Sequence, residues 1–311
     1  MASVYLFDGD QLRGIASPES ARRLRWAAWR PHGEYALLVG NRGQVFRFDE
    51  GRFDDLPSQS SHNLRGAAWS PDGALALLAG NRGAVLLYDG QRFHELPSVT
   101  AENLRRVAWA PDNSCALIIG NGGVVLRFDR DTGALLPLPG DRAHTMRSIA
   151  WRPDGAYALI GAYSSAYAGY PRPHMLYRCD GRYTQALLAT DDQDDAVAIA
   201  FRPGTQPPRA LVLSVAYRDN DAVANKLFEY DGSTFATTPV EAPAALLGAA
   251  WRPDGAHALI CGERGALFRY DGRSIDALAS NTNDNLVGPF WRPGEASALV
   301  LKGPDERVYT V

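Results

Sequence analysis

Short runs of apolar residues separated by turn residues recur along the whole chain, and one forty-residue stretch shows the pattern clearly. Its apolar-rich runs fall at residues 64–69, 74–79, 84–88 and 92–96. Pro71-Asp72-Gly73 separates the first two runs, and Asp89-Gly90 separates the last two. Asp-Gly pairs favour tight turns because glycine accepts a positive φ. The pattern predicts four antiparallel strands, named A to D in chain order, and leaves no segment for a capped amphipathic helix.

The same unit occurs seven times, and each copy of strand A ends on an aromatic anchor. The anchors are Trp29, Trp69, Trp109, Trp151, Phe201, Trp251 and Trp291. Their spacings of 40, 40, 42, 50, 50 and 40 residues match a four-stranded propeller blade. The sequence therefore predicts an all-β, seven-bladed β-propeller with four-stranded antiparallel blades, forming a single domain over residues 1–311.

The repeated Trp-Arg-Pro-Asp-Gly and Tyr-Asp-Gly motifs resemble those of a known group of proteins. The blade is similar to the repeats of the WD-repeat-like bacterial β-propeller superfamily, over nearly the whole chain. The Gly-His and Trp-Asp dipeptides of true WD repeats are missing, so their hydrogen-bond network is not carried over. The resemblance implies a binding platform or scaffold for protein–protein interactions.

Ring closure requires the chain ends to complete one blade, because an open propeller would expose strand edges. The N-terminal hairpin at residues 4–15 matches strands C and D, and we expect it to close the blade begun by Trp291. Residues 308–311 also match strand C. One of these two segments is therefore surplus, and the pattern does not decide which.

The composition limits the cellular compartments and the classes of partner that we expect. The net charge is −3 and no Lys/Arg run occurs, so we expect no nucleic-acid partner. No signal peptide or membrane-spanning run is present, so we expect a cytoplasmic protein without membrane contact. Cys115, Cys179 and Cys261 match no metal-ligand spacing and are expected to be free thiols. No cofactor and no metal are expected.

Two B–C connections are long and polar, at residues 162–174 and 216–225. Insertions in repeat proteins usually lie on the binding face, and tyrosine-rich loops are typical of binding surfaces. The candidate contact residues are Tyr163, Tyr167, Tyr170, His174, Tyr217 and Arg218. Alternatively, these loops fold over each other or cap the central channel.

An acidic D–A connection at residues 190–195 lies between the same two repeats. Asp191, Asp192 and Asp195, with Asp219 nearby, could attract a basic partner or bind calcium. The ordered ligand series of a calcium loop is missing. The alternative is a solvated acidic loop.

A third candidate lies four residues before each anchor. This position is Arg25, Arg65, Arg105 and Arg147 in the first four repeats, but Val197, Leu247 and Val287 in the others. The four arginines could form a basic arc around the channel mouth, joined by Arg42 and Arg82, and could hold an anionic group. Alternatively, each arginine pairs with a neighbouring loop carboxylate or carbonyl. The arginines of the Trp-Arg-Pro motif lie on the opposite face and are expected to be structural.

These features favour a non-catalytic binding or sensor propeller that recognises a protein, peptide or small ligand on the B–C/D–A face near blades 4 and 5. A protein or peptide partner is favoured over a small ligand. No catalytic residue is assigned, because the six histidines are scattered and no nucleophile motif occurs. The alternatives are a propeller hydrolase or lyase with its site at the channel mouth, and a lectin.

Overall fold

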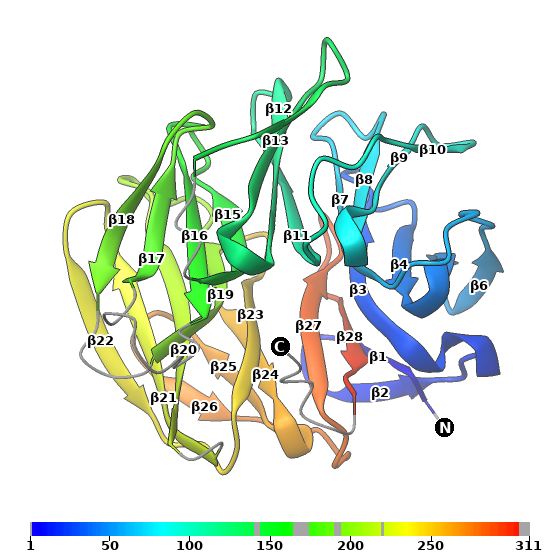
Figure 1. The fold of residues 1–311 in the computed structure, drawn as a ribbon. Coiled ribbons are helices and arrows are strands. Elements are labelled where there is room, and N and C mark those ends of the chain that lie inside the picture. Colours follow the sequence, from blue (N-terminus) through cyan, green and yellow to red (C-terminus); the bar gives the residue numbers. More distant parts are fainter. Residues whose placement is uncertain (1, 140–143, 164–173, 190–193, 219–220, 305–311) are drawn as a thin grey trace.

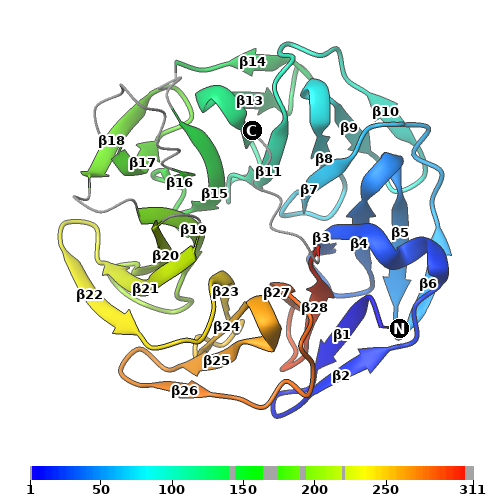
Figure 2. The same ribbon diagram turned by 60° about the horizontal axis from the view of Figure 1, so that its bottom comes forward.

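The fold is a closed ring of seven antiparallel sheets. The computed structural model describes residues 2–139, 144–163, 174–189, 194–218 and 221–304. In this part of the chain the strands form seven four-stranded sheets around a central axis (Figures 1 and 2). The predicted seven-bladed propeller is confirmed.

The first three blades follow one another in chain order, with strand A innermost. Blade 1 contains β3 (Leu24–Trp29), β4 (Ala36–Gly40), β5 (Val45–Asp49) and β6 (Arg52–Asp55). Blade 2 contains β7 (Leu64–Trp69), β8 (Ala76–Gly80), β9 (Val85–Tyr88) and β10 (Phe93–Glu95). Blade 3 contains β11 (Leu104–Trp109), β12 (Cys115–Gly120), β13 (Val125–Asp129) and β14 (Leu135–Pro137).

The next three blades repeat this order, and most strands of blades 4 and 5 are longer than their counterparts in the first three blades. Blade 4 contains β15 (Thr145–Trp151), β16 (Ala158–Tyr163), β17 (His174–Cys179) and β18 (Thr184–Ala189). Blade 5 contains β19 (Asp194–Phe201), β20 (Ala210–Arg218), β21 (Asp221–Tyr230) and β22 (Phe235–Val240). Blade 6 contains β23 (Leu246–Trp251), β24 (Ala258–Gly262), β25 (Leu267–Tyr270) and β26 (Ile275–Ala277).

Blade 7 joins the two ends of the described chain. Its sheet order is β2-β1-β28-β27, from β1 (Val4–Phe7), β2 (Leu12–Ile15), β27 (Leu286–Trp291) and β28 (Ala298–Lys302). Val4 pairs with Leu301 and Phe7 pairs with Ala298. The N-terminal hairpin thus supplies the two outer strands of this blade. Residues 308–311, the competing copy of strand C, lie outside the described residues.

Short 3-10 helices, which were not expected, occupy several connections of the described chain. They are η1 (Glu19–Arg23), η2 (Asn41–Gly43), η3 (Asn81–Gly83), η4 (Asn121–Gly123) and η5 (Glu263–Gly265). Four of them are the B–C turns of blades 1, 2, 3 and 6. A single 3-10 turn needs neither caps nor an apolar stripe, which is why the periodicity of the sequence did not reveal it.

The core lies between neighbouring blades. Leu37 of blade 1 packs with Trp69 and Leu78 of blade 2, and both leucines are fully buried. Four of the anchor tryptophans, but not Trp69 and Trp251, also bind the preceding blade through the indole N–H. This bond runs from Trp29 to the carbonyl of Phe290, from Trp109 to Ala68, from Trp151 to Ala108 and from Trp291 to Ala250, at 2.9–3.1 Å. The anchors therefore fix blade to blade.

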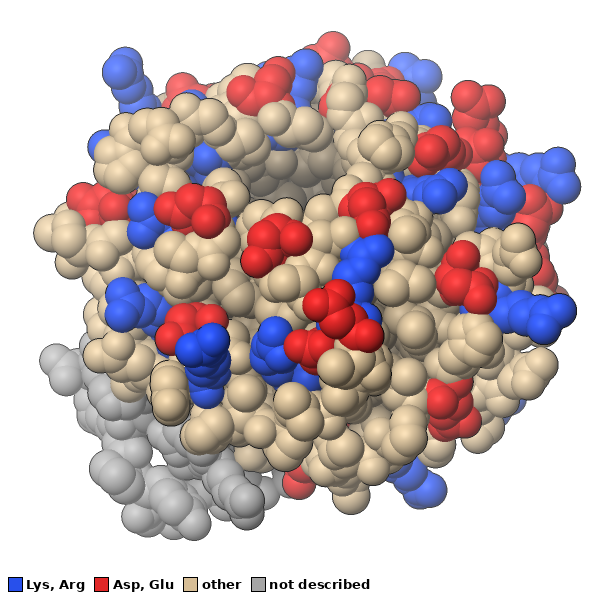
Figure 3. Space-filling view, turned by 90° about the horizontal axis from the view of Figure 1, so that it is seen from above, with Lys and Arg blue, Asp and Glu red and all other residues tan. Residues whose placement is uncertain are grey.

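The A–B and C–D turns form one face of the ring, where arginines link adjacent blades. The Nε of Arg292 in blade 7 donates to the carbonyl of Gly33 in blade 1 at 2.8 Å. Its guanidinium lies 5.1 Å from the ring centre of Trp29. Arg30 and Arg202 make the same pair of contacts with the blades that follow them. Basic and acidic side chains are interspersed over this face in Figure 3.

Candidate functional site

A β-bulge recurs at the channel end of strand A, and it creates the candidate site. In blade 1, Leu24 pairs with Gly40 and Trp26 pairs with Val39, so Arg25 has no partner across the ladder. Arg65, Arg105 and Arg147 occupy the same bulge in blades 2, 3 and 4. A bulge re-aims the extra side chain and often marks a functional position. Figure 2 shows that strand A is the innermost strand of each of these blades, so the bulges bring the four arginines to the channel.

Three of these arginines are held by an asparagine of their own blade. The Nε of Arg105 donates to Oδ1 of Asn121 at 2.6 Å. Arg25 and Arg65 donate in the same way to the asparagines at the start of η2 and η3. These bonds use only Nε. No hydrogen bond joins the terminal guanidinium nitrogens of the three side chains to another described residue, and no described carboxylate forms an ion pair with them.

The arginines are close enough to perturb one another electrostatically. Burial lowers the pKa of Arg105 to about 9, assisted by the charges of Arg147 and Arg65. Burial, with the charges of Arg25 and Arg147, lowers the pKa of Arg65 to about 10. Both arginines remain protonated at neutral pH. The cluster therefore concentrates positive charge that an anion would neutralise.

A tyrosine and a carboxylate lie beside Arg147, the fourth arginine of the arc. The guanidinium of Arg147 lies 4.4 Å from the ring centre of Tyr163 in β16. Burial raises the pKa of Tyr163, and the charge of Asp195 raises it further. Asp195 is only 2% exposed and pairs with Val215. The expected acidic loop therefore ends earlier than residue 195, and Asp195 is a buried strand residue beside the arc.

Two exposed arginines adjoin the arc in an unusual backbone conformation. Arg42 and Arg82 have φ values of 55° and 56°, in the left-handed region that favours glycine. Their backbone N–H groups donate to Oδ1 of Asn63 and Asn103 in the next blade. Gly122 occupies the same position in blade 3, with φ 59°. Arg264 of blade 6, outside the arc, has the same conformation (φ 55°) and the same bond from its backbone N–H to an asparagine of the next blade, so the conformation belongs to the turn and does not by itself assign a role to the side chains.

The other side of the channel is apolar. Val197 and Leu247 occupy the bulge in blades 5 and 6, and Val287 precedes a wider irregularity in blade 7. All three are half-buried and line a cavity of about 180 Å³ in the channel.

Trp26 and Arg106, which the sequence analysis missed, also line this cavity. The guanidinium of Arg106 lies 3.8 Å from the ring centre of Trp26. Both follow the bulge residue directly. In blades 2, 4, 5, 6 and 7 this position holds a small residue. The bulky Trp26 and Arg106 in blades 1 and 3 were therefore the signal in the sequence that could have identified these two lining residues.

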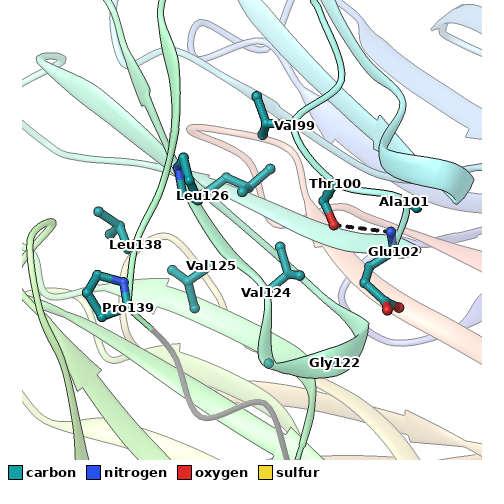
Figure 4. Close-up of a pocket in the computed structure, with 12 residues that line it drawn as sticks. Val99, Thr100, Ala101, Glu102, Gly122, Val124, Val125, Leu126, Leu138 and Pro139 are labelled. Carbon is teal, nitrogen blue, oxygen red and sulfur yellow. Dashed lines mark hydrogen bonds between the residues drawn. The ribbon is translucent and has the colours of Figure 1, made fainter.

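A larger hollow lies away from the channel. It measures about 650 Å³ and lies between the connection that enters blade 3 and the outer strands of that blade (Figure 4). Val99, Val124 and Leu138 contribute apolar side chains to its lining, polar groups make up much of its surface, and Glu102 is the one charged residue among the described residues that line it. None of the described residues that line this groove is a cation, and none belongs to the arc.

The remaining candidates are only partly described. Tyr167, Tyr170, Asp191, Asp192 and Asp219 lie outside the described residues, as do the side chains of His174, Tyr217 and Arg218. The expected loop 216–225 is wrong in extent, because Tyr217 and Arg218 belong to β20 and pair with Ala222 and Asp221 of β21.

Metal-binding groups do not gather anywhere in the part of the chain that the structure describes. No three His, Cys, Asp or Glu side chains of this part could share a metal ion. The three cysteines are buried and free. Among the described helices, none has the length and apolar run needed to cross a membrane.

Comparisons with known proteins support the fold. No family model and no curated protein sequence matches the chain. Among solved structures, it is similar to the β-propeller domain of Cps50 (Swd1) from Myceliophteria thermophila, with a TM-score of 0.64 and 14% identity. The match covers 91% of this chain and 97% of that chain. The likeness shows the propeller fold.

Proposed function

We propose that this propeller is a non-catalytic binding module that recognises an anionic group of its partner at the arginine arc, defined as Arg25, Arg65, Arg105 and Arg147. The arc lies on the face of the B–C and D–A connections. Arg147 and Tyr163 join it to blade 4, and Asp195 joins it to blade 5. The partner is a protein or peptide in preference to a small ligand.

The observation that carries this proposal is the state of the guanidinium groups. Asn41, Asn81 and Asn121 hold the Nε atoms of Arg25, Arg65 and Arg105, so the side chains are fixed in direction. Their terminal nitrogens are left as donors toward the mouth. Fixed guanidinium forks suit carboxylates and phosphates because they form paired, charge-assisted hydrogen bonds. An anion would also relieve the repulsion between the like charges.

The function is testable with a peptide that carries charge but no apolar side chain. A fluorescein-labelled peptide of alternating glutamate and glycine is titrated with the protein, and fluorescence anisotropy reports binding. Each hydrogen bond to a charged group contributes about 1.5–3 kcal/mol. The double variant Arg65→Ser/Arg105→Ser is therefore expected to bind at least tenfold more weakly, and binding by the wild type is expected to weaken as salt is raised.

The matched control removes the same charge from the opposite face. Arg182 and Arg209 are exposed and their side chains bind no described residue, so Arg182→Ser/Arg209→Ser should bind like the wild type. Equal losses in both double variants would show only a general effect of net charge. That result, or wild-type affinity in the arc variant, would overturn the proposal.

A further inference from the structure

The channel mouth has two walls of different chemistry at the same level. The bulge position carries arginine in blades 1 to 4, and it carries Val197 and Leu247 in blades 5 and 6. Val287 holds the corresponding position in blade 7. A ligand that enters the mouth therefore meets cations on one side and apolar side chains on the other.

We propose that the partner presents an acidic peptide segment in which an apolar residue lies beside the carboxylates. Its carboxylates bind the arginine arc, and its apolar side chain enters the cavity bounded by Val197, Leu247 and Val287. This inference rests on the proposed function, since the same arc supplies the charge.

The size of the cavity favours a single side chain over a whole small molecule. Its volume is about 180 Å³. Sites for small organic ligands usually measure about 300–1,000 Å³. The cavity is therefore too small for such a ligand, but one aliphatic side chain of a peptide would leave its backbone outside, next to the arginines.

The cationic side of the cavity is rigid. Nη1 of Arg106 donates to the carbonyl oxygens of Arg65 and Arg105, at 2.9 and 2.8 Å. The indole N–H of Trp26 donates to the carbonyl of Ala67 at 3.1 Å, and its ring packs edge-on against Phe290. These contacts fix a wall against which an apolar side chain can pack without rearrangement, which lowers the cost of binding.

The two walls of the mouth should also make it bind such a peptide in preference to inorganic phosphate. Phosphate would bind the arginines but leave the valines and Leu247 in contact with water. An acidic peptide with one leucine would cover both walls. Burying a leucine side chain contributes about 1.5–3 kcal/mol, which corresponds to about a 10- to 100-fold gain in affinity.

The experiment compares two labelled peptides, one of alternating glutamate and glycine and one in which leucine replaces the central glycine. The wild type is expected to bind the leucine peptide at least tenfold more tightly. Leu247→Asn should remove this gain while it leaves the affinity for the glycine peptide unchanged. Val287→Thr, which keeps the side-chain shape, should reduce the gain and serves as the second variant if Leu247→Asn folds poorly.

The control is Val99→Asn, in the separate groove of Figure 4. Val99 is 41% exposed, so this change removes a comparable apolar side chain from another surface and should alter neither affinity. Equal affinity of the wild type for the two peptides would overturn the inference but leave the proposed function standing. Failure of Arg65→Ser/Arg105→Ser to weaken either peptide would overturn both. Tighter binding of inorganic tripolyphosphate than of the leucine peptide would also overturn the inference.

Discussion

Arginines on the two faces of the ring make opposite use of the same side chain. On the face of the A–B and C–D turns, Arg30, Arg202 and Arg292 reach into the next blade, where each donates to a glycine carbonyl and covers a tryptophan ring. On the other face, Arg25, Arg65 and Arg105 bind only an asparagine of their own blade. The first group holds blades together. The second group is held by its blade and presents its terminal nitrogens outward.

The largest expected effect is on the free energy of unfolding, which should fall much more when an arginine of the turn face is removed than when one of the arc is removed. Arg292→Ala removes the bond to Gly33, the contact with Trp29 and the ion pair with Glu295, and should lower the free energy of unfolding by about 2 kcal/mol. Arg65→Ala should change it by less than about 0.5 kcal/mol, because a lost hydrogen bond is offset by relief of repulsion. Urea denaturation at pH 7 measures both. Equal losses would mean that the arc is as structural as the opposite face.

The next effect concerns the arginines with positive φ. Arg42→Gly and Arg82→Gly should each raise the free energy of unfolding by about 0.5–1 kcal/mol, because relief of left-handed strain exceeds the added freedom of the unfolded chain. The same variants should bind the glutamate–glycine peptide about two- to fivefold more weakly, as expected for exposed ion pairs. Thermal denaturation and anisotropy give the two values. If stability and affinity fell together, the two side chains would belong to the fold instead of the site.

Salt should have a smaller effect on the free energy of unfolding, and this effect depends on the repulsion between the arginines of the arc. Raising NaCl from about 0.02 to 0.2 M shortens the Debye length and screens like charges. The wild type should gain a few tenths of a kcal/mol in stability, and Arg65→Ser/Arg105→Ser should gain less. Urea denaturation at the two salt concentrations tests this, with Arg182→Ser/Arg209→Ser as the control. A gain that is identical in all three proteins would contradict electrostatic strain within the arc.

The smallest effect lies on the turn face and depends on pH. His257 is 9% exposed and packs edge-on against Trp291, as Tyr35 packs against Trp69. Burial lowers the pKa of His257 below its ordinary value of 6.5, and the charges of Arg269 and Arg252 add to this. The unfolded chain therefore binds a proton more readily than the folded chain, and stability falls as the pH drops through 6.5. His257→Tyr should lose less stability between pH 7 and pH 5, measured by urea denaturation, and an equal loss would contradict this cause.

The fold was predictable because turn chemistry and strand period agree in every repeat. In blade 2 the predicted strand at 64–69 coincides with β7, and the predicted second strand begins two residues before Ala76 of β8. The difference arises because the turn extends to Leu75, whose N–H donates to the hydroxyl of Ser70. Local residues therefore specified each blade well.

The site was only partly predictable, since it depends on contacts between blades. The four arginines of the arc were visible at one position of the aligned repeats. The β-bulge that directs their side chains was not, because it is a register shift between strands A and B and leaves no periodic pattern in the sequence. Arg106 resembles an ordinary strand residue until the fold brings β11 close to β3, where its guanidinium covers the ring of Trp26 at the edge of the cavity. The carboxylate of Asp195 was likewise grouped with a loop, because the strand that buries it begins within the acidic run.

The hairpin that completes blade 7 affects how the protein can be made. Val4 pairs with Leu301, so β1, the first strand of the ring to be synthesised, has to wait for β28. At about 5–20 residues per second, synthesis of the intervening chain takes about 15–60 s. Throughout this time β1 and β2 form an isolated hairpin with an open edge, which is marginally stable and able to pair with other chains. Yield in the cell is therefore expected to depend on how fast the ribosome completes the ring, and on chaperones that cover this edge in the meantime.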